Sequence, residues 1–146
     1  MSVSKTCHRN VVYIDENAGI TEVAEMMREK HVGSIIVVDQ AGKPIGIVTD
    51  RDLVVEILAE EVPPEKVVLK DIMTPDPVVI NENEDIADAL EKMSQKTVRR
   101  APVVDKDGLL SGIISIDDIL TRLGKEINDI TRLINQSRIK ESESRK

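Results

Sequence analysis

The chain contains the segment GIVTDRD at residues 46–52 and the related segment GIISIDD at residues 112–118. In each segment a glycine precedes an aliphatic run, the run reaches a hydroxyl residue, and an aspartate follows three positions later. The aliphatic run predicts a buried strand, and a Ser or Thr three positions before an acid is typical of a helix start. We therefore expect two equivalent strand-to-helix corners, one formed by Thr49 and Asp52 and the other by Ser115 and Asp118.

The similarity between the two segments extends over most of the chain. Residues 12–58 align with residues 78–124 without a gap when the sequence is shifted by 66 positions, and about a third of the aligned residues are identical. Ungapped self-similarity over such a length indicates internal duplication. Each copy is too short to bury its apolar sheet face alone, so we expect two half-domains packed about a pseudo-twofold axis, with both corners beside a shared cleft.

The pattern of apolar residues places the secondary structure within each copy. In the first copy it predicts strands at residues 11–14, 34–39 and 45–49, a helix beginning near Ile20, and a second helix over about residues 50–60 that buries Leu53, Ile57 and Leu58. The boundaries that follow are a first repeat over residues 7–62, a linker over 63–70, a second repeat over 71–124, a helical extension over 125–136 and a disordered polar tail over 137–146. The expected fold class is α/β, of the α+β kind, with a C-terminal helix.

Apolar residues continue at helical spacing beyond the second repeat. They are Ile119, Leu123, Ile127, Ile130 and Ile134, and they predict a helix over about residues 117–136. This apolar stripe is longer than the second half-domain needs. A helix from a second copy of the chain would cover it and produce a homodimer; the alternative is a helix that folds back on its own domain.

Composition limits the classes of function. The 146 residues carry a net charge of −7, and Tyr13 is the only aromatic residue. A nucleic-acid surface needs basic side chains, and single strands are usually held by aromatic stacking, so nucleic acid is not an expected partner. The chain has one cysteine, Cys7, no apolar run of about 20 residues and no secretory signal, so we expect a cytoplasmic protein without a disulfide or a membrane span.

The two corners have a structural explanation and a functional one. As capping boxes they satisfy the free N–H groups of a helix start and need no ligand. As a duplicated pair beside a cleft, they place carboxylates, which only accept hydrogen bonds, where the two hydroxyl donors of a vicinal diol can bind. A phosphate would be repelled by these carboxylates and would point elsewhere. A diol at the corner and a phosphate away from it describe a nucleotide.

Two more segments accompany the second corner: DIMTP at residues 71–75 and RRAPV at residues 99–103. With the repeated pattern of a glycine-led strand, a hydroxyl residue and an aspartate after a hairpin, they resemble a tandem pair of CBS domains, a Bateman module, over about residues 7–123. The resemblance implies two β-α-β-β-α repeats packed through their sheets. It also implies two symmetric clefts that bind AMP, ADP or ATP, or in some members S-adenosylmethionine, in modules that commonly dimerise into a flat disk.

The resemblance further implies roles for individual residues. The ribose of one nucleotide would lie on Thr49 and Asp52, and that of a second nucleotide on Ser115 and Asp118. Phosphate groups of the first nucleotide would meet Arg99 and Arg100, and those of the second would meet Arg51. The expected adenine wall consists of Ile36, Met73, Thr74, Ala101 and Pro102.

The two copies differ where the phosphates are expected. The first copy has Gly33-Ser34 in place of the two arginines, and residues 7–9, CHR, in place of MTP at residues 73–75. We therefore expect the cleft at Asp118 to bind phosphates more weakly than the cleft at Asp52.

Metal binding and catalysis are the other readings of the polar residues. Cys7, His8 and His31 match no common zinc spacing. Asp50 and Asp117 add acids to the first turns of helices, where the helix dipole favours them without any catalytic role. We expect no metal, no cofactor and no enzymatic activity.

The function we infer from the sequence is a stand-alone regulatory module that senses cellular energy through an adenine nucleotide and acts on an unidentified protein. Three alternatives stay open: a protein-interaction module with vestigial clefts, a regulator that binds S-adenosylmethionine, and a subunit of an enzyme whose catalytic chain is separate.

Overall fold

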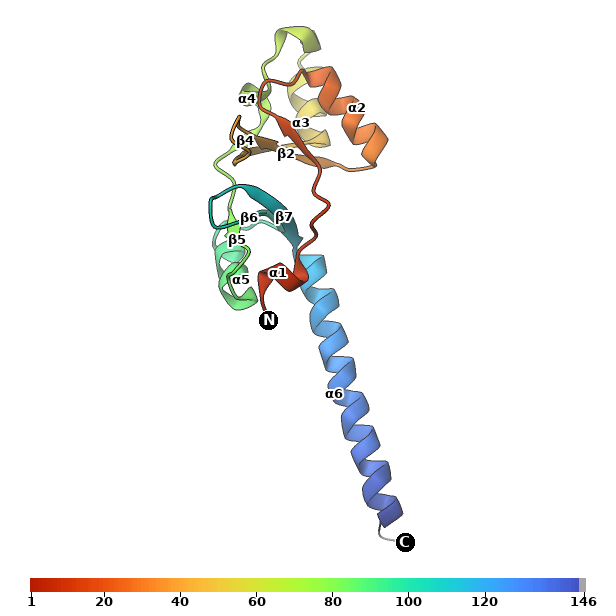
Figure 1. Ribbon diagram of the computed structural model, residues 1–146. Coiled ribbons are helices and arrows are strands. Elements are labelled where there is room, and N and C mark those ends of the chain that lie inside the picture. The colour runs from red at the N-terminus through yellow and green to blue at the C-terminus, as the bar shows by residue number, and fades with distance from the viewer. Residues whose placement is uncertain (145–146) are drawn as a thin grey trace.

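Residues 1–144 are described by the structure, a computed structural model of the chain. Two small sheets lie face to face with helices on their outer sides, and one long helix leaves the body (Figure 1). The strand order is β1-β2-β3-β4 in the first sheet and β5-β6-β7 in the second. The α/β fold class, the two repeats packed through their sheets and the C-terminal helix are thus confirmed.

The first sheet consists of β1 (Tyr13–Asp15), β2 (Ser34–Val38), β3 (Pro44–Thr49) and β4 (Thr74–Pro75). β1 runs parallel to β2, whereas β3 is antiparallel to both of its neighbours. The outer face is covered by α2 (Ile20–Lys30), by α3 (Asp50–Leu53) and by the π-helical turn η1 (Val54–Leu58). Residues 35–38 are all buried, as expected of a strand that is covered on both faces.

The second sheet repeats this arrangement with β5 (Ile80–Asn81), β6 (Arg100–Val104) and β7 (Leu110–Ser115). β5 is parallel to β6, and β6 is antiparallel to β7. α5 (Ile86–Gln95) and the start of α6 (Ile116–Ser144) pack on its outer face. Even the irregularity in pairing recurs at equivalent positions, at Val37/Val38 and at Val103/Val104.

Each repeat also receives a short segment that precedes the other repeat in sequence. Val3 of α1 (Val3–Thr6) lies in the core of the second repeat. Leu69 of α4 (Leu69–Ile72) lies in the core of the first, and β4 continues into the first sheet. The expected linker over residues 63–70 therefore contains the 3-10 turn η2 (Pro64–Lys66) and the start of α4. Each hydrophobic core therefore includes a segment that belongs, in sequence order, to the other repeat.

The helix expected over residues 50–60 differs in its second half. α3 passes into η1, in which the N–H of Ala59 donates to the carbonyl of Val54 at 2.8 Å. Ile57, four residues after Leu53, is buried, but Leu58, which we expected in the core, is 72% exposed.

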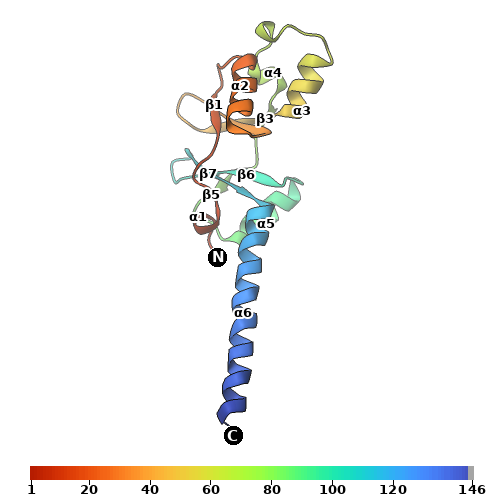
Figure 2. The same cartoon turned by 90° about the vertical axis from the view of Figure 1, so that its right-hand side faces the viewer.

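The C-terminal helix is longer than we expected. α6 is continuous over 29 residues, so residues 137–144, predicted to be a disordered tail, are helical, whereas residues 145–146 lie outside the described part. Figures 1 and 2 show α6 projecting from the second repeat in both views. Ile119 is the one residue of residues 116–144 that is fully buried. No helix within residues 1–144 combines the length and apolarity needed to cross a membrane.

Candidate functional site

The first corner forms where β3 ends and α3 begins. Asp52 Oδ2 accepts a hydrogen bond from the N–H of Thr49 at 2.8 Å, and Thr49 Oγ1 accepts one from the N–H of Asp52 at 3.1 Å. This reciprocal pair is the capping box that the sequence predicts. Within residues 1–144, Asp52 Oδ1 has no hydrogen-bond partner. The half-buried carboxylate therefore keeps one oxygen for a donor from outside the chain.

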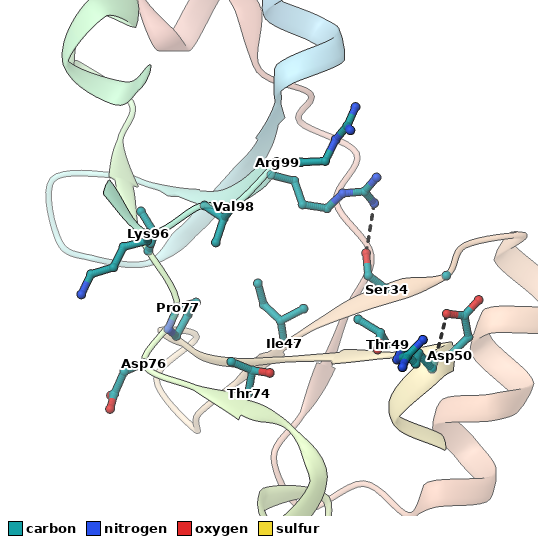
Figure 3. A pocket seen from close by; sticks show the side chains of 14 residues that line it. Ser34, Ile47, Thr49, Asp50, Thr74, Asp76, Pro77, Lys96, Val98 and Arg99 are labelled. Carbon is teal, nitrogen blue, oxygen red and sulfur yellow. Dashed lines mark hydrogen bonds between the residues drawn. The ribbon is translucent and has the colours of Figure 1, made fainter. Parts of the chain in front are cut away.

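A cleft of about 780 Å³ opens beside this corner, between the two sheets. Figure 3 shows Ile47, Thr49 and Thr74 on one side of it and Lys96, Val98 and Arg99 on the other. The first group comes from β3 and β4, and the second from the segment between α5 and β6. The complete lining is Gly33, Ser34, Ile47, Thr49, Asp50, Arg51, Thr74, Asp76, Pro77, Val78, Lys96, Val98, Arg99 and Arg100. Both repeats are needed to form it.

Cations from the second repeat face the first corner across the cleft. Arg100 Nη1 donates to Ser34 Oγ at 3.2 Å. Arg99 lies 3.6 Å from Asp117, but both side chains are at least three-quarters exposed, so this ion pair holds Arg99 weakly. Lys96 also lines the cleft. In a chain with a net charge of −7, this is a local concentration of positive charge suited to an anionic group.

Backbone space next to the corner is limited by Asp50. A Cβ atom on Gly33 would lie 3.0 Å from Asp50 Oδ2, and the N–H of Asp50 donates to the carbonyl of Gly33 at 2.9 Å. Asp50 Oδ1 accepts from the N–H of Arg51 at 2.8 Å, which Figure 3 marks. Gly33 therefore lets the corner approach β2 closely. An arginine there, as at the equivalent Arg99, would displace Asp50.

The second corner has the same capping geometry but a different outer partner. Asp118 Oδ2 accepts hydrogen bonds from the N–H and the hydroxyl of Ser115, at 3.1 Å and 2.8 Å. Asp118 Oδ1 lies 2.7 Å from Nε2 of His8. Both oxygens of this carboxylate are thus engaged. The position that is open to a donor at Asp52 is filled at Asp118 by a side chain of the protein.

The second cleft is smaller, at about 300 Å³. Its lining is Asn10, Val11, Val12, His31, Val32, Gly33, Ser34, Ile36, Arg100 and Ile113, and most of these residues align with the lining of the first cleft after the 66-residue shift. Ser115 and Asp118 are not among them, whereas the first cleft is lined by Thr49 but not by Asp52. Arg51, which we expected to serve a ligand at Asp118, lines the first cleft instead. The two clefts are equivalent in position but not in size or chemistry.

The expected adenine wall is only partly assembled. Thr74 lines the first cleft, and Ile36 lines the second. Met73 packs into the core of the first repeat, and its sulfur occupies the space that a Cβ on Gly46 would take. Ala101 is fully buried in the core of the second repeat, because alternate residues of a strand point to opposite faces and Ala101 points to the helices. Pro102 is also fully buried. These last three do not line the first cleft.

The apolar lining that the sequence analysis missed comes from Ile47, Val78 and Val98. Ile47 lies within the repeated corner segment itself, two residues before Thr49. Its alternation with the buried Val48 was the available signal, because one of the two neighbours had to face the other sheet. Lys96 offered no such signal. Among residues 1–144, no three His, Cys, Asp or Glu side chains gather in a way that could hold a metal ion.

The sequence matches a family model described as CBS domain twice, at residues 3–59 and 69–125. Among curated proteins, it is 35% identical over 120 residues to MK0525 of Methanopyrus kandleri. That alignment covers 82% of this chain and 61% of the relative, so the chain spans less than two thirds of the relative's length.

Two solved structures share the fold. The CBS domain protein PAE2072 from Pyrobaculum aerophilum, complexed with AMP, has a TM-score of 0.71 and 26% identity, over 86% of this chain and 99% of that one. The CBS domain pair of protein MJ0100, in complex with 5′-methylthioadenosine and S-adenosyl-L-methionine, has a TM-score of 0.72 and 26% identity, over 86% of this chain and 98% of that one.

Proposed function

The chain belongs to the CBS domain family, and on that premise we propose that it is a regulatory module that binds an adenine nucleotide, AMP, ADP or ATP, in the first cleft. One observation carries the proposal. The cleft joins Thr49, the hydroxyl residue of the first corner, to three cations from the second repeat, Lys96, Arg99 and Arg100, and Asp52 is hydrogen-bonded to Thr49 without lining the cleft itself. An adenine nucleotide carries a diol on its ribose and phosphate on the 5′ oxygen of the same sugar. One such molecule could therefore contact the corner and the cations at the same time.

The ribose would bind at the first corner. Asp52 Oδ1 would accept one ribose hydroxyl, and Thr49, whose Oγ1 accepts from the N–H of Asp52, lines the cleft. Hydrogen bonds to a charged acceptor contribute about 1.5–3 kcal/mol each. The adenine ring would lie between Ile47 and Val98, whose aliphatic side chains line opposite walls. That arrangement supports a nucleotide in a chain without Phe or Trp.

The phosphate would bind at Arg100 and Arg99. Both arginines are exposed, so they can reorient toward a ligand at little cost in desolvation. The relative PAE2072, which was solved with AMP, supports this class of ligand. The relative MJ0100 was solved with S-adenosylmethionine, and that ligand carries a sulfonium cation. Four cations, Arg51, Lys96, Arg99 and Arg100, line the cleft against two carboxylates, Asp50 and Asp76, and this balance favours the nucleotide over the sulfonium compound.

The second cleft would bind phosphates weakly or not at all. The His8 side chain contacts the outer oxygen of Asp118. Gly33 and Ser34 hold the positions that correspond to Arg99 and Arg100. We therefore propose one nucleotide per chain.

Calorimetric titration of the full chain with AMP, ADP, ATP and S-adenosylmethionine tests the proposal. We expect one nucleotide per chain and a loss of affinity of about tenfold or more in Asp52→Asn, because Asn keeps the cap but not the charged acceptor. Asp88→Asn, which removes the same charge from the first turn of α5, is the matched control and should bind as the wild type does. The absence of heat with all four compounds would remove the nucleotide from the proposal.

We also propose that α6 pairs with α6 of a second copy of the chain. Leu120, Leu123, Ile127, Ile130 and Ile134 alternate spacings of three and four residues and are between 38% and 62% exposed. Such spacing forms the seam of a coiled coil. Ile119, which we had placed in this stripe, is instead buried in the second repeat, and Leu120 takes its place.

A second copy is the favoured occupant for two reasons. Two identical stripes present ten half-exposed aliphatic side chains, whose burial contributes about 1 kcal/mol each, comparable with the cost of association of about 4–15 kcal/mol. In addition, Asp117 and Arg138 lie toward opposite ends of the helix. In an antiparallel pair of identical helices these opposite charges would approach each other.

A further inference from the structure

A third hollow of about 420 Å³ lies outside both clefts, where α1 meets the first turns of α6. Figures 1 and 2 both show α1 beside this end of α6. Its lining is Lys5, Thr6, His8, Asp118, Thr121, Arg122 and Lys125. Three of these side chains carry a permanent positive charge, which outweighs the negative charge of the one carboxylate, Asp118, whose oxygens accept hydrogen bonds from Ser115 and contact His8. We call this hollow the α1–α6 pocket.

The internal duplication shows that the fold does not require these cations. Lys5, Arg122 and Lys125 align with Asp71, Glu56 and Ala59 of the other copy. The entry helices match, since α1 and α4 are equivalent and Val3 and Leu69 are both fully buried, whereas Glu56 lies in η1 and Ala59 directly after it, in contrast to the regular helix that holds Arg122 and Lys125. The same entry helix and corner therefore form with two acids and an alanine in one place and with three bases in the other. The bases are a property of this pocket and not of the repeat.

Arg122 has a hydrogen-bond donor that the chain leaves unused. Its Nε is inaccessible to solvent and has no acceptor within residues 1–144. The nearest carboxylate oxygen, Oε1 of Glu126, is 3.6 Å away, which is too long for a hydrogen bond. A buried N–H without an acceptor is destabilising. The Arg122 side chain as a whole is 38% exposed, so it can reorient toward the pocket, where an anionic oxygen would supply that acceptor.

We propose that the α1–α6 pocket binds a phosphoryl group. A phosphoryl dianion has three acceptor oxygens, which match the fork of Arg122, the ammonium groups of Lys5 and Lys125, and the nearby threonine hydroxyls. The volume holds a phosphate or a diphosphate group. The source is either free inorganic phosphate or pyrophosphate, or the phosphate end of a larger molecule; the chemistry of recognition is the same.

The pocket and the apolar stripe lie on opposite sides of α6. Asp118, Thr121, Arg122 and Lys125 are spaced by three, one and three residues and share one helical face, about half a turn away from Ile127. The pocket therefore stays open when the stripe is covered. Binding here does not depend on the nucleotide proposed for the first cleft.

The test is a titration of the full chain with inorganic pyrophosphate at low ionic strength, followed by calorimetry and by amide chemical shifts. We expect one site per chain, with shifts concentrated at residues 5–8 and 118–125. The double variant Arg122→Gln, Lys125→Gln should bind at least about tenfold more weakly. The matched control Arg132→Gln, Lys140→Gln removes the same two charges from α6 outside the pocket and should bind as the wild type does.

Three results would overturn the proposal: no binding of pyrophosphate, an equal loss in the control, or a loss caused by Arg100→Gln, which would place the ligand in the first cleft. ATP and adenosine distinguish the sources. If ATP shifts the pocket amides at lower concentration than pyrophosphate does and adenosine does not, the phosphoryl group belongs to a larger ligand. If pyrophosphate is the tighter ligand, the free anion is the source. Binding of AMP at Asp52, measured in the same double variant, reports separately on the first cleft.

Discussion

Arg100 donates a hydrogen bond to Ser34, its own counterpart in the other repeat, across the interface between the two sheets. The two residues are 66 positions apart and line both clefts. The duplicated position holds an arginine in one repeat and a serine in the other. The interface between the sheets therefore has one arginine at this position and not two. This divergence makes the two clefts unequal although the backbone around them is repeated.

Arg100→Gln should lower the affinity for AMP by about tenfold or more, because one charge-assisted contact to phosphate contributes about 1.5–3 kcal/mol. Ser34→Ala removes the hydrogen bond in the free protein but no charge. It should leave the affinity unchanged or raise it slightly, because Arg100 is then released. Calorimetry on both variants checks this, and equal losses in the two would contradict a direct role of Arg100 in binding phosphate.

His8→Ala should open the second corner. The His8 side chain is 66% exposed, and its contact with Asp118 is the feature that distinguishes this carboxylate from Asp52. With the imidazole removed, we expect a second, weaker nucleotide-binding event in the calorimetric titration. Arg28→Ala is a suitable control, because it removes an exposed basic side chain from α2, which lines neither cleft. A stoichiometry that stays at one nucleotide in His8→Ala would mean that other features close this cleft.

Ile127→Asp should dissociate the proposed dimer. Ile127 lies at the middle of the apolar stripe and is 62% exposed, so the substitution would place two carboxylates in the seam without affecting either core. Arg132→Asp changes charge on the opposite face of α6 and should leave the dimer intact. Sedimentation equilibrium measures both. A wild-type protein that sediments as a monomer at every concentration would rule out this pairing.

Gly112→Ala and Gly124→Ala should change stability in opposite directions. A Cβ on Gly112 would lie 2.7 Å from the carbonyl oxygen of His8, which is fixed by a hydrogen bond from the N–H of Ile113. We expect a loss of about 1–3 kcal/mol from this overlap. Gly124 lies within α6 with nothing within 4 Å of a Cβ, so alanine should gain about 1 kcal/mol through helix propensity. Denaturant unfolding of both variants measures the difference.

Acid should weaken the attachment of the N-terminal segment. Arg9 donates to Glu82 Oε2 at 2.8 Å, and Ser111 donates to the same oxygen at 2.9 Å. These hydrogen bonds, that from Arg9 first, hold the pKa of Glu82 below its ordinary value. A carboxyl group whose pKa is lowered by folding stabilises the fold above its unfolded pKa of about 4.3, and this contribution is lost as the pH falls through the lower folded value.

Glu82→Gln keeps an acceptor but does not ionise. We therefore expect the free energy of unfolding to fall less steeply with decreasing pH in this variant than in the wild type. Urea midpoints measured at a series of pH values below neutrality check this. Identical slopes in the two proteins would show that Glu82 does not contribute.

Several features were predictable because they depend on residues close together in the sequence. The capping box at Thr49 and Asp52 is one, since its two partners lie three positions apart and bond to each other's backbone. The antiparallel hairpins and the helical stripe after Leu123 are others, and the repeat was visible because the two copies align without a gap. Leu58 was misplaced because it is apolar, although five residues after Leu53 it lies about 140° around a regular helix from that residue and so faces away from the core. Ala101 was misplaced because the pattern RRAPV does not reveal which face of β6 turns to the helices.

The sequence by itself determined the duplication, the two capped corners and the α/β class, because strand burial and helix capping are set by neighbouring side chains. The tertiary structure alone decided that α1 and α4 exchange repeats, that His8 meets Asp118 from 110 positions away, and that the larger cleft joins Thr49 of the first corner to a group of cations from the second repeat. Such contacts depend on how two sheets are placed against each other. That placement is set by the summed energy of many weak apolar contacts distributed along the chain, and no single segment determines it.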